Sequence, residues 1–268
     1  EACNGLRAVT NDDGTPKTGY ASVKVVTLWD GSAVNSKITG NYAGSYLWEL
    51  QPGSIPDADL GKTNTIYKKD VSDTASWLVN SSGEQEVTMS SKQTLINFLT
   101  WANARYAGTH TAVILSDHGA AVHTDLIAAR SMFTDNTAGD QDQMIETIDY
   151  GPVLKQCGFD KDNKLDLFFL HACLEGTLET MYEVNDCARY CAAAANVSMG
   201  GFFAYDSMIE ALTTDADGKT VGRNLINGYM TAMNQIYPAD TFKNLASDIN
   251  TYYGNPTIGG VSITNDNV

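Results

Sequence analysis

The sequence predicts an α/β fold, an α/β/α sandwich in which helices cover both faces of a mainly parallel central sheet. Two short apolar stretches, residues 112–115 and 167–170, are typical of strands that are buried on both faces. Amphipathic helical patterns alternate with these strands along the chain, as they do in α/β proteins. Both stretches run into polar residues and a glycine, at the strand ends where parallel sheets bind their ligands.

The first part of the chain is expected to contain a loop and two strands. Residues 1–20 are rich in Gly, Asn and Asp and lack an apolar period, which predicts an N-terminal extension or loop before a single domain of residues 21–268. One strand is expected over residues 23–29, where Asp-Gly ends it, and another over residues 45–50. Residues 57–83 are expected to be mostly loop.

Apolar stripes at helical spacing predict the helices. One helix is expected from Ser90, whose hydroxyl can cap it, to about Gly108. Its apolar stripe consists of Leu95, Phe98, Leu99, Ala102 and Tyr106. Later stripes predict helices over residues 177–191, 225–236 and 242–249. Between the two apolar strands, residues 120–142 are acidic and without a period, and loops of this length are usually functional or disordered.

Composition and charge narrow the class of partner. Lys and Arg number 17 against 32 Asp and Glu, so the formal net charge is −15. This charge repels phosphate backbones and anionic membrane surfaces, so nucleic acid is not expected as a partner. No apolar run approaches the ~20 residues that span a bilayer, so no membrane span is expected. The acidity and the many Gly, Asn, Ser and Thr residues favour an exported protein whose signal has already been removed.

The cysteines raise the question of chemistry. Because their number, five, is odd, at least one thiol should be free. Cys187 and Cys191 lie four residues apart without a CxxC partner, which predicts two side chains on one helix face rather than zinc ligands, and no metal site is expected. Cys173 ends the stretch "LDLFFLHAC" and has two interpretations: buried packing, the default for a free cysteine, or a nucleophile.

A nucleophilic Cys173 needs partners, because a thiol with a free pKa of about 8.5 is largely protonated at neutral pH. His118 and Gly119 follow the other apolar strand, so His118 faces the same crevice as Cys173 if the two strands are neighbours. His118 can then protonate a leaving amine, and the backbone N–H groups of Gly119 and Cys173 can hold an oxyanion. A helix that begins near Gly176 would direct its positive dipole end to the sulfur.

These motifs resemble those of a known family. An apolar strand that ends in His-Gly, 55 residues before an Ala-Cys that ends a second one, resembles the caspase-type cysteine peptidases. Within that group the chain is most similar to the clostripain-like branch, in which the string "DACLMG" is typical and is matched here by "HACLEG". Residues 87–119 and the segment "GGFFAYD" at 200–206 are also similar to that branch. The resemblance covers roughly residues 21–240.

The resemblance implies a caspase-like α/β/α sandwich and a cysteine endopeptidase that acts on proteins or peptides. It assigns His118 and Cys173 as a dyad that works through a thioester acyl-enzyme, with Gly119 and Cys173 as the oxyanion hole. It also implies self-cleavage in the loop of residues 120–142, where Arg130 marks the expected site unless it is simply a solvated surface residue. A cleaved fragment of its own precursor is then an expected partner, and the protein is expected to be secreted or held in the cell envelope of a bacterium. Calcium is implied by the resemblance only, and no other cofactor is expected.

The substrate specificity stays open, as do structural roles for the pocket residues and a non-catalytic function. Clostripain-like enzymes prefer Arg or Lys before the scissile bond, but His171 stands where the branch has Asp, so basic specificity is not carried over. His171, Ala172 and Asp206 are assigned to the substrate pocket, although His171 can equally tune the thiol or serve structure, and Asp206 can cap a helix. The rival function is a non-catalytic peptide- or surface-binding module on the same fold, whose thiol would be no more reactive than free cysteine.

Overall fold

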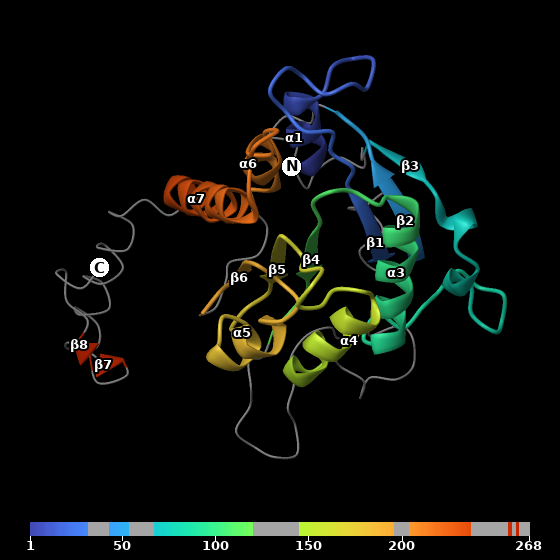
Figure 1. Cartoon of the computed structure of the whole chain (residues 1–268). Helices are drawn as coiled ribbons and strands as arrows, with labels where there is room; N and C mark the ends of the chain where they lie inside the picture. Colours follow the sequence, from blue (N-terminus) through green and yellow to red (C-terminus); the bar gives the residue numbers. More distant parts are fainter. Residues whose placement is uncertain are drawn as a thin grey trace.

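A parallel sheet lies at the centre of the chain and confirms the predicted α/β fold (Figure 1). The computed structural model describes residues 1–31, 43–53, 67–119, 145–195, 204–236, 257–258 and 261–262. The sheet has the order β4-β5-β6, and its strands are β4 (Ala112–Ser116), β5 (Leu167–His171) and β6 (Cys191–Ala193). Both pairings are parallel, and the β4–β5 register runs from Ala112 opposite Leu167 to Ser116 opposite His171.

Helices cover both faces of this sheet, as predicted. Successive strand residues point to opposite faces, so Val113 and Phe168 pack into one apolar cluster while Leu167 packs into another. The first cluster is shared with α3 (Lys92–Arg105), α4 (Tyr150–Gln156) and α5 (Leu178–Val184). The second is shared with α1 (Ala2–Val9), α6 (Tyr205–Glu210) and α7 (Gly218–Ile236). The two groups of helices lie on opposite sides of the sheet in Figure 1.

The prediction of a loop over residues 1–20 is wrong for its first half, where α1 forms. Its buried stripe is Cys3, Leu6 and Val9, three residues apart, which the surrounding Gly, Asn and Asp obscure in the sequence. The helix packs closely on α6, and a Cβ added at Gly5 would lie only 2.8 Å from the Cα of Asp206. Tertiary contact therefore stabilises a helix that is too short to form alone.

A second sheet, antiparallel, accompanies the parallel one. It has the order β1-β2-β3, with β1 (Val26–Gly31), β2 (Gly44–Leu50) and β3 (Lys68–Asp70). The first two strands were predicted, whereas β3 and the 3-10 helices Ser72–Thr74 and Ser76–Leu78 lie in the segment expected to be loop. Phe98 and Trp101 of α3 pack against the cluster around Leu47, so α3 connects the two sheets.

The predicted helices are confirmed in part. Helix α3 begins one residue later than expected, because Ser91 rather than Ser90 accepts the capping hydrogen bond, from the backbone N–H of Gln93 at 3.2 Å. Helix α7 ends at Ile236 as expected. The helix over 177–191 is wrong beyond Val184, because the backbone around Cys187 bonds to Leu165 and residues from Cys191 form β6.

The remaining elements are short. Helices α4 and α6 have seven and six residues, too few for a clear period, and were not predicted. The 3-10 helix Thr147–Asp149 precedes α4, and β7 (Thr257–Ile258) pairs with β8 (Val261–Ser262). The helix predicted over 242–249 lies outside the described residues. Among the helices that the structure describes, none has the length and apolar character needed to cross a membrane.

Candidate active site

The site is built at the carboxyl ends of β4 and β5, which are neighbours in the sheet. Their register ends with Ser116 opposite His171, and His118 and Cys173 each lie two residues beyond this last pair. His118 is exposed and Cys173 is half-buried, so both are open to a substrate from this edge. The two residues that the sequence singled out therefore follow adjacent strands at one end of the sheet.

Direct packing of the two strand ends is visible at Gly119. A Cβ added there would overlap the carbonyl oxygen of Cys173 and lie 2.9 Å from the Cβ of Ala172. It would also lie 3.0 Å from the Cγ of Glu175. Only glycine allows the His-Gly segment to come this close to the turn that carries the thiol.

The turn after Cys173 is strained. Leu174 has φ 63°, a left-handed conformation that costs a residue with a Cβ roughly 1–2 kcal/mol. The next residues anchor the turn, because the N–H of Gly176 donates to the carbonyl of Ala194 at 2.8 Å, just beyond β6. Backbone strain of this kind is found preferentially at functional sites, where the surrounding structure holds it in place.

Helix α5 begins later than predicted, at Leu178 rather than near Gly176. Its N-cap is Thr177, whose hydroxyl accepts from the backbone N–H of Thr180 at 3.2 Å. The helix is therefore separated from Cys173 by the strained turn, and one of its N-terminal donors is already satisfied by the cap.

His171, the last residue of β5, is buried and is held by two hydroxyl groups, from the half-buried Tyr205 and the exposed Ser116. Its side chain is 8% exposed, and its Nδ1 lies 2.6 Å from the Tyr205 hydroxyl and 3.0 Å from the Ser116 hydroxyl. Burial lowers the pKa of His171 to about 4, so the imidazole is neutral at neutral pH. Burial also raises the pKa of Tyr205, which keeps its hydroxyl protonated. This pairing favours an Nδ1 that accepts and a proton on Nε2.

Glu175 forms a second buried polar contact, on the opposite face of the sheet. It is fully buried, and its Oε2 accepts a hydrogen bond from the hydroxyl of Tyr150 at 3.2 Å. Tyr150 begins α4 and is 1% exposed, with its ring packed edge-on to Phe168. The sequence analysis missed both residues. The available signal was Glu175 itself, an acidic residue where the string "DACLMG" has Met.

The other residues assigned to the pocket lie in different settings. Ala172 is 3% exposed and belongs to the apolar cluster on the α4 face. Asp206 lies in the first turn of α6, where its Oδ1 accepts from the backbone N–H of Ser207 at 2.8 Å. It is the preceding residue, Tyr205, that connects α6 to the site. Arg130 and the loop of residues 120–142 lie outside the described residues.

The four remaining cysteines have the character of packing residues. All five thiols are free of disulfides, as an odd number required for at least one. Burial raises the pKa of Cys3, Cys157 and Cys187, and it raises the pKa of Cys191 to about 12. Thiols with such pKa values stay protonated and are poor nucleophiles. Cys173 is thus the cysteine whose position at a strand end suits chemistry.

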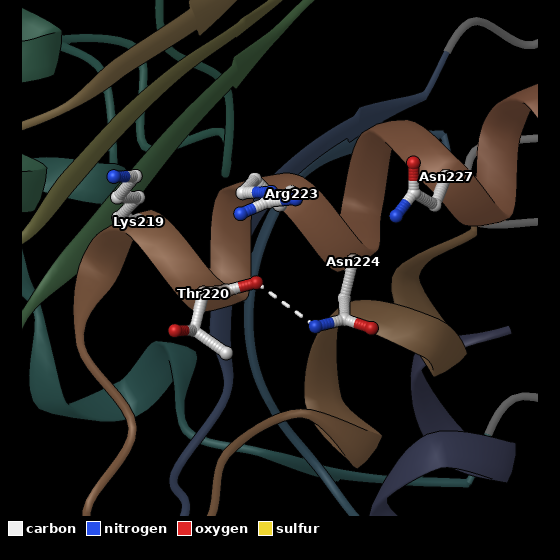
Figure 2. Close-up of a pocket in the computed structure, with 5 residues that line it drawn as sticks. All are labelled: Lys219, Thr220, Arg223, Asn224 and Asn227. Carbon is white, nitrogen blue, oxygen red and sulfur yellow. Dashed lines mark hydrogen bonds between the residues drawn. The ribbon is translucent and has the colours of Figure 1, made fainter.

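A hollow on the surface of α7 lies apart from this edge. Figure 2 shows its five lining residues along one stretch of the helix, where the side-chain amide of Asn224 donates to the carbonyl of Thr220 at 2.9 Å. Lys219, Arg223 and Asn227 complete the lining. This helix face has no thiol and no His, Asp or Glu that could act as a base for the Thr220 hydroxyl, so we do not assign the active site there.

Calcium finds no fitting site among the described residues. In the segment 160–164, Oδ1 of Asp160 accepts from the backbone N–H groups of Asp162 and Asn163 at 2.9 and 3.1 Å, so the carboxylate closes a turn. Nowhere in the described ranges do three or more His, Cys, Asp or Glu side chains gather in a group that could hold a metal. No chemical step is therefore derived through a metal.

Comparison with known proteins identifies relatives. A sequence profile of the clostripain family matches residues 11–245, and no curated protein gives a significant match. A secreted C11 cysteine protease from Bacteroides thetaiotaomicron, solved with an irreversible peptide inhibitor, is similar with a TM-score of 0.58 and 12% identity over 89% of this chain and 54% of that chain. An inactive zymogen C11 protease from Parabacteroides distasonis is similar with a TM-score of 0.55 and 13% identity over 96% and 60%.

These likenesses establish the fold, which agrees with the predicted caspase-like sandwich. The chain spans between 54% and 60% of the length of the two solved proteins.

Proposed function

The chain belongs to the clostripain family, and from this membership we propose that it is a cysteine endopeptidase acting on proteins or peptides through His118 and Cys173. One observation carries the proposal: β4 and β5 are parallel neighbours, His118 and Cys173 each follow two residues after the last paired residues of these strands, and Gly119 packs against the turn of Cys173. A base and a thiol at one open sheet edge, beside a close backbone approach, are the components that acyl transfer requires.

In the first half of the reaction, Cys173 attacks the carbonyl carbon of the scissile bond as a thiolate. A C–S bond forms while the carbonyl oxygen becomes an oxyanion, which the N–H groups of Gly119 and Cys173 stabilise. The C–N bond then breaks, and the imidazolium of His118 gives its proton to the departing amine. The product of this half is a thioester between Cys173 and the acyl part of the substrate.

In the second half, water takes the place of the amine. The imidazole of His118, now neutral, accepts a proton from water as its oxygen attacks the thioester carbon. The C–S bond breaks, the carboxylic acid product leaves, and the thiolate with its imidazolium partner is restored. No further cofactor enters this balance.

The residue preferred before the scissile bond is proposed to be uncharged. His171 occupies the position of the family's Asp, and it is neutral because its buried imidazole has a lowered pKa. A neutral side chain provides no ion-pair partner for Arg or Lys. The Tyr205 and Ser116 hydroxyl groups at its Nδ1 are consistent with a polar but uncharged environment.

Self-processing and export are the remaining parts of the proposal. Cleavage in the loop of residues 120–142 would use the same dyad, and Arg130 would be the site only if the pocket also accepts a basic side chain, which a neutral His171 does not favour. One similar solved chain is described as an inactive zymogen, and another as secreted, which supports maturation and a location outside the cell or in the envelope. Intact-mass analysis and fractionation of the producing cells test these two points separately.

Cleavage of a positional-scanning fluorogenic peptide library tests the main proposal, with Cys173→Ala as the comparison. We expect the unmodified chain to cut and Cys173→Ala to be inactive, with a preference for uncharged residues before the scissile bond. A strong preference for Arg or Lys would contradict the role given to His171. If neither protein cuts and Cys173 alkylates no faster than free cysteine, the binding-module function replaces the peptidase.

A further inference from the structure

Two tyrosines, Tyr150 buried and Tyr205 half-buried, approach the Cys173 turn from opposite faces of the sheet. Tyr205 begins α6 and meets His171, two residues before Cys173, at 2.6 Å. Tyr150 begins α4 and meets Glu175, two residues after Cys173, at 3.2 Å. Helices α4 and α6 lie on opposite sides of the sheet (Figure 1). The turn is therefore bonded to both helix layers, once on each side of the thiol.

Burying the carboxyl group of Glu175 at this position costs free energy. A carboxyl group that is fully removed from water loses its hydration, and the loss must be compensated by hydrogen bonds. The apolar Met of the string "DACLMG" would fill similar space without this penalty. A packing role alone does not account for a carboxyl group here, and the hydrogen bond from the anchored Tyr150 is a contact that Met could not make.

The turn also needs a restraint on this face. Leu174 is held at φ 63°, between Cys173 and Glu175, and relaxing it would move both neighbours. Gly119 has no space for a side chain against the Cys173 carbonyl and the Glu175 side chain. A shift of Glu175 would thus alter the spacing between the two proposed oxyanion donors, the N–H groups of Gly119 and Cys173.

We propose that Tyr150 and Glu175 are positioning residues, whose hydrogen bond fixes the turn of Cys173 against Gly119 from the α4 face. This role rests on the proposed peptidase function of Cys173. Neither residue touches the reacting atoms. Their effect is on the geometry of the nucleophile and the oxyanion donors, where a displacement of about 1 Å can lower the rate by about a hundredfold.

The test compares Tyr150→Phe, Glu175→Met and Glu175→Gln in the full chain, with kcat and KM measured on the best library peptide below the lowest melting temperature. Tyr150→Phe and Glu175→Met should each lower kcat about tenfold and leave KM nearly unchanged. Glu175→Gln keeps a carbonyl acceptor for the Tyr150 hydroxyl and should restore kcat to within about threefold. The double variant Tyr150→Phe with Glu175→Met should be no slower than either single variant.

Matched controls come from α5. Tyr182 is 79% exposed and Glu179 is also exposed, so Tyr182→Phe and Glu179→Gln should leave kcat and KM unchanged. The proposal is overturned if Glu175→Met keeps the original kcat, if Gln does not rescue, or if the losses in the double variant multiply. A rise in KM with an unchanged kcat would also overturn it.

Hydrogen exchange separates this proposal from the peptidase function. Amides of residues 172–176 should exchange faster in Tyr150→Phe and Glu175→Met than in the unmodified chain, while those of β4 should not change. If the unmodified chain cuts no peptide, the peptidase function fails, and the restraint is judged by exchange alone. Unchanged exchange across the turn would then reject the role of Tyr150 and Glu175.

Discussion

On the α6 face of the parallel sheet a neutral imidazole, His171, pairs with Tyr205, whereas on the α4 face a carboxyl group, Glu175, accepts a hydrogen bond from Tyr150. Both contacts join a helix start to the segment around Cys173, and the Glu175 contact is buried whereas the His171 contact is partly buried. The imidazole can lose its charge on burial and accept a hydrogen bond, so it tolerates an apolar setting as long as the pH stays near neutral. Glu175 has the Tyr150 hydroxyl as its donor. The same anchoring task is thus met by an imidazole on one face and by a carboxyl group on the other.

The largest effect should come from a change that displaces the Cys173 turn even when both tyrosine contacts are intact. Gly119→Ala would place a methyl group onto the Cys173 carbonyl, and we expect kcat/KM to fall by about a hundredfold. Gly108→Ala is the control, because its Cβ would make only an ordinary contact of 3.4 Å with the carbonyl of His110. Peptide cleavage assays of both variants provide the measurement. Full activity in Gly119→Ala would show that catalysis does not depend on the close approach of Gly119 to the Cys173 carbonyl.

Lowering the pH should reduce the folding stability that neutral His171 contributes on the α6 face. The folded pKa of His171 is about 4 against an ordinary 6.5, so between these values the unfolded chain binds the proton more readily. Stability from this group is therefore present above pH 6.5 and is lost as the pH falls towards 4, by about 2 kcal/mol between pH 7 and pH 5. Urea unfolding at both pH values measures the loss. His171→Gln should reduce the pH dependence, and an unchanged slope in that variant would contradict the assignment.

The smallest effect should come from removing one hydroxyl on that face. Tyr205→Phe deletes the donor to His171 and should lower the free energy of unfolding by about 1 kcal/mol. The Ser116 hydroxyl, 3.0 Å from the same nitrogen, can take over the bond to it and limits the loss. Chemical denaturation, with Tyr182→Phe as control, measures it. A destabilisation well above ~2 kcal/mol would contradict this small effect.

Much of the fold was predictable because its signals are local. Four apolar residues in a row, from Leu167 to Leu170, predict a doubly buried strand, and the stripe of α3 repeats over enough turns to be recognised. The short helices α4 and α6 and the stripe of α1 escaped prediction because fewer than three turns leave too little period. The false continuation of a helix to Cys191 has a different cause, since pairing with β5 there outweighs helical spacing.

The sequence by itself determined the α/β class, and it singled out His118, Gly119 and Cys173. These features are recognisable because an apolar strand, the polar residues at its end and the glycine or cysteine that follows are adjacent in the sequence. Only the tertiary structure decided that β4 and β5 are neighbours, and that His171 and Glu175 are each bonded to a tyrosine from a different helix layer. Tyr205 is 34 residues from His171 along the chain, and Tyr150 is 25 from Glu175. Contacts over such separations depend on how layers pack, which no local pattern encodes.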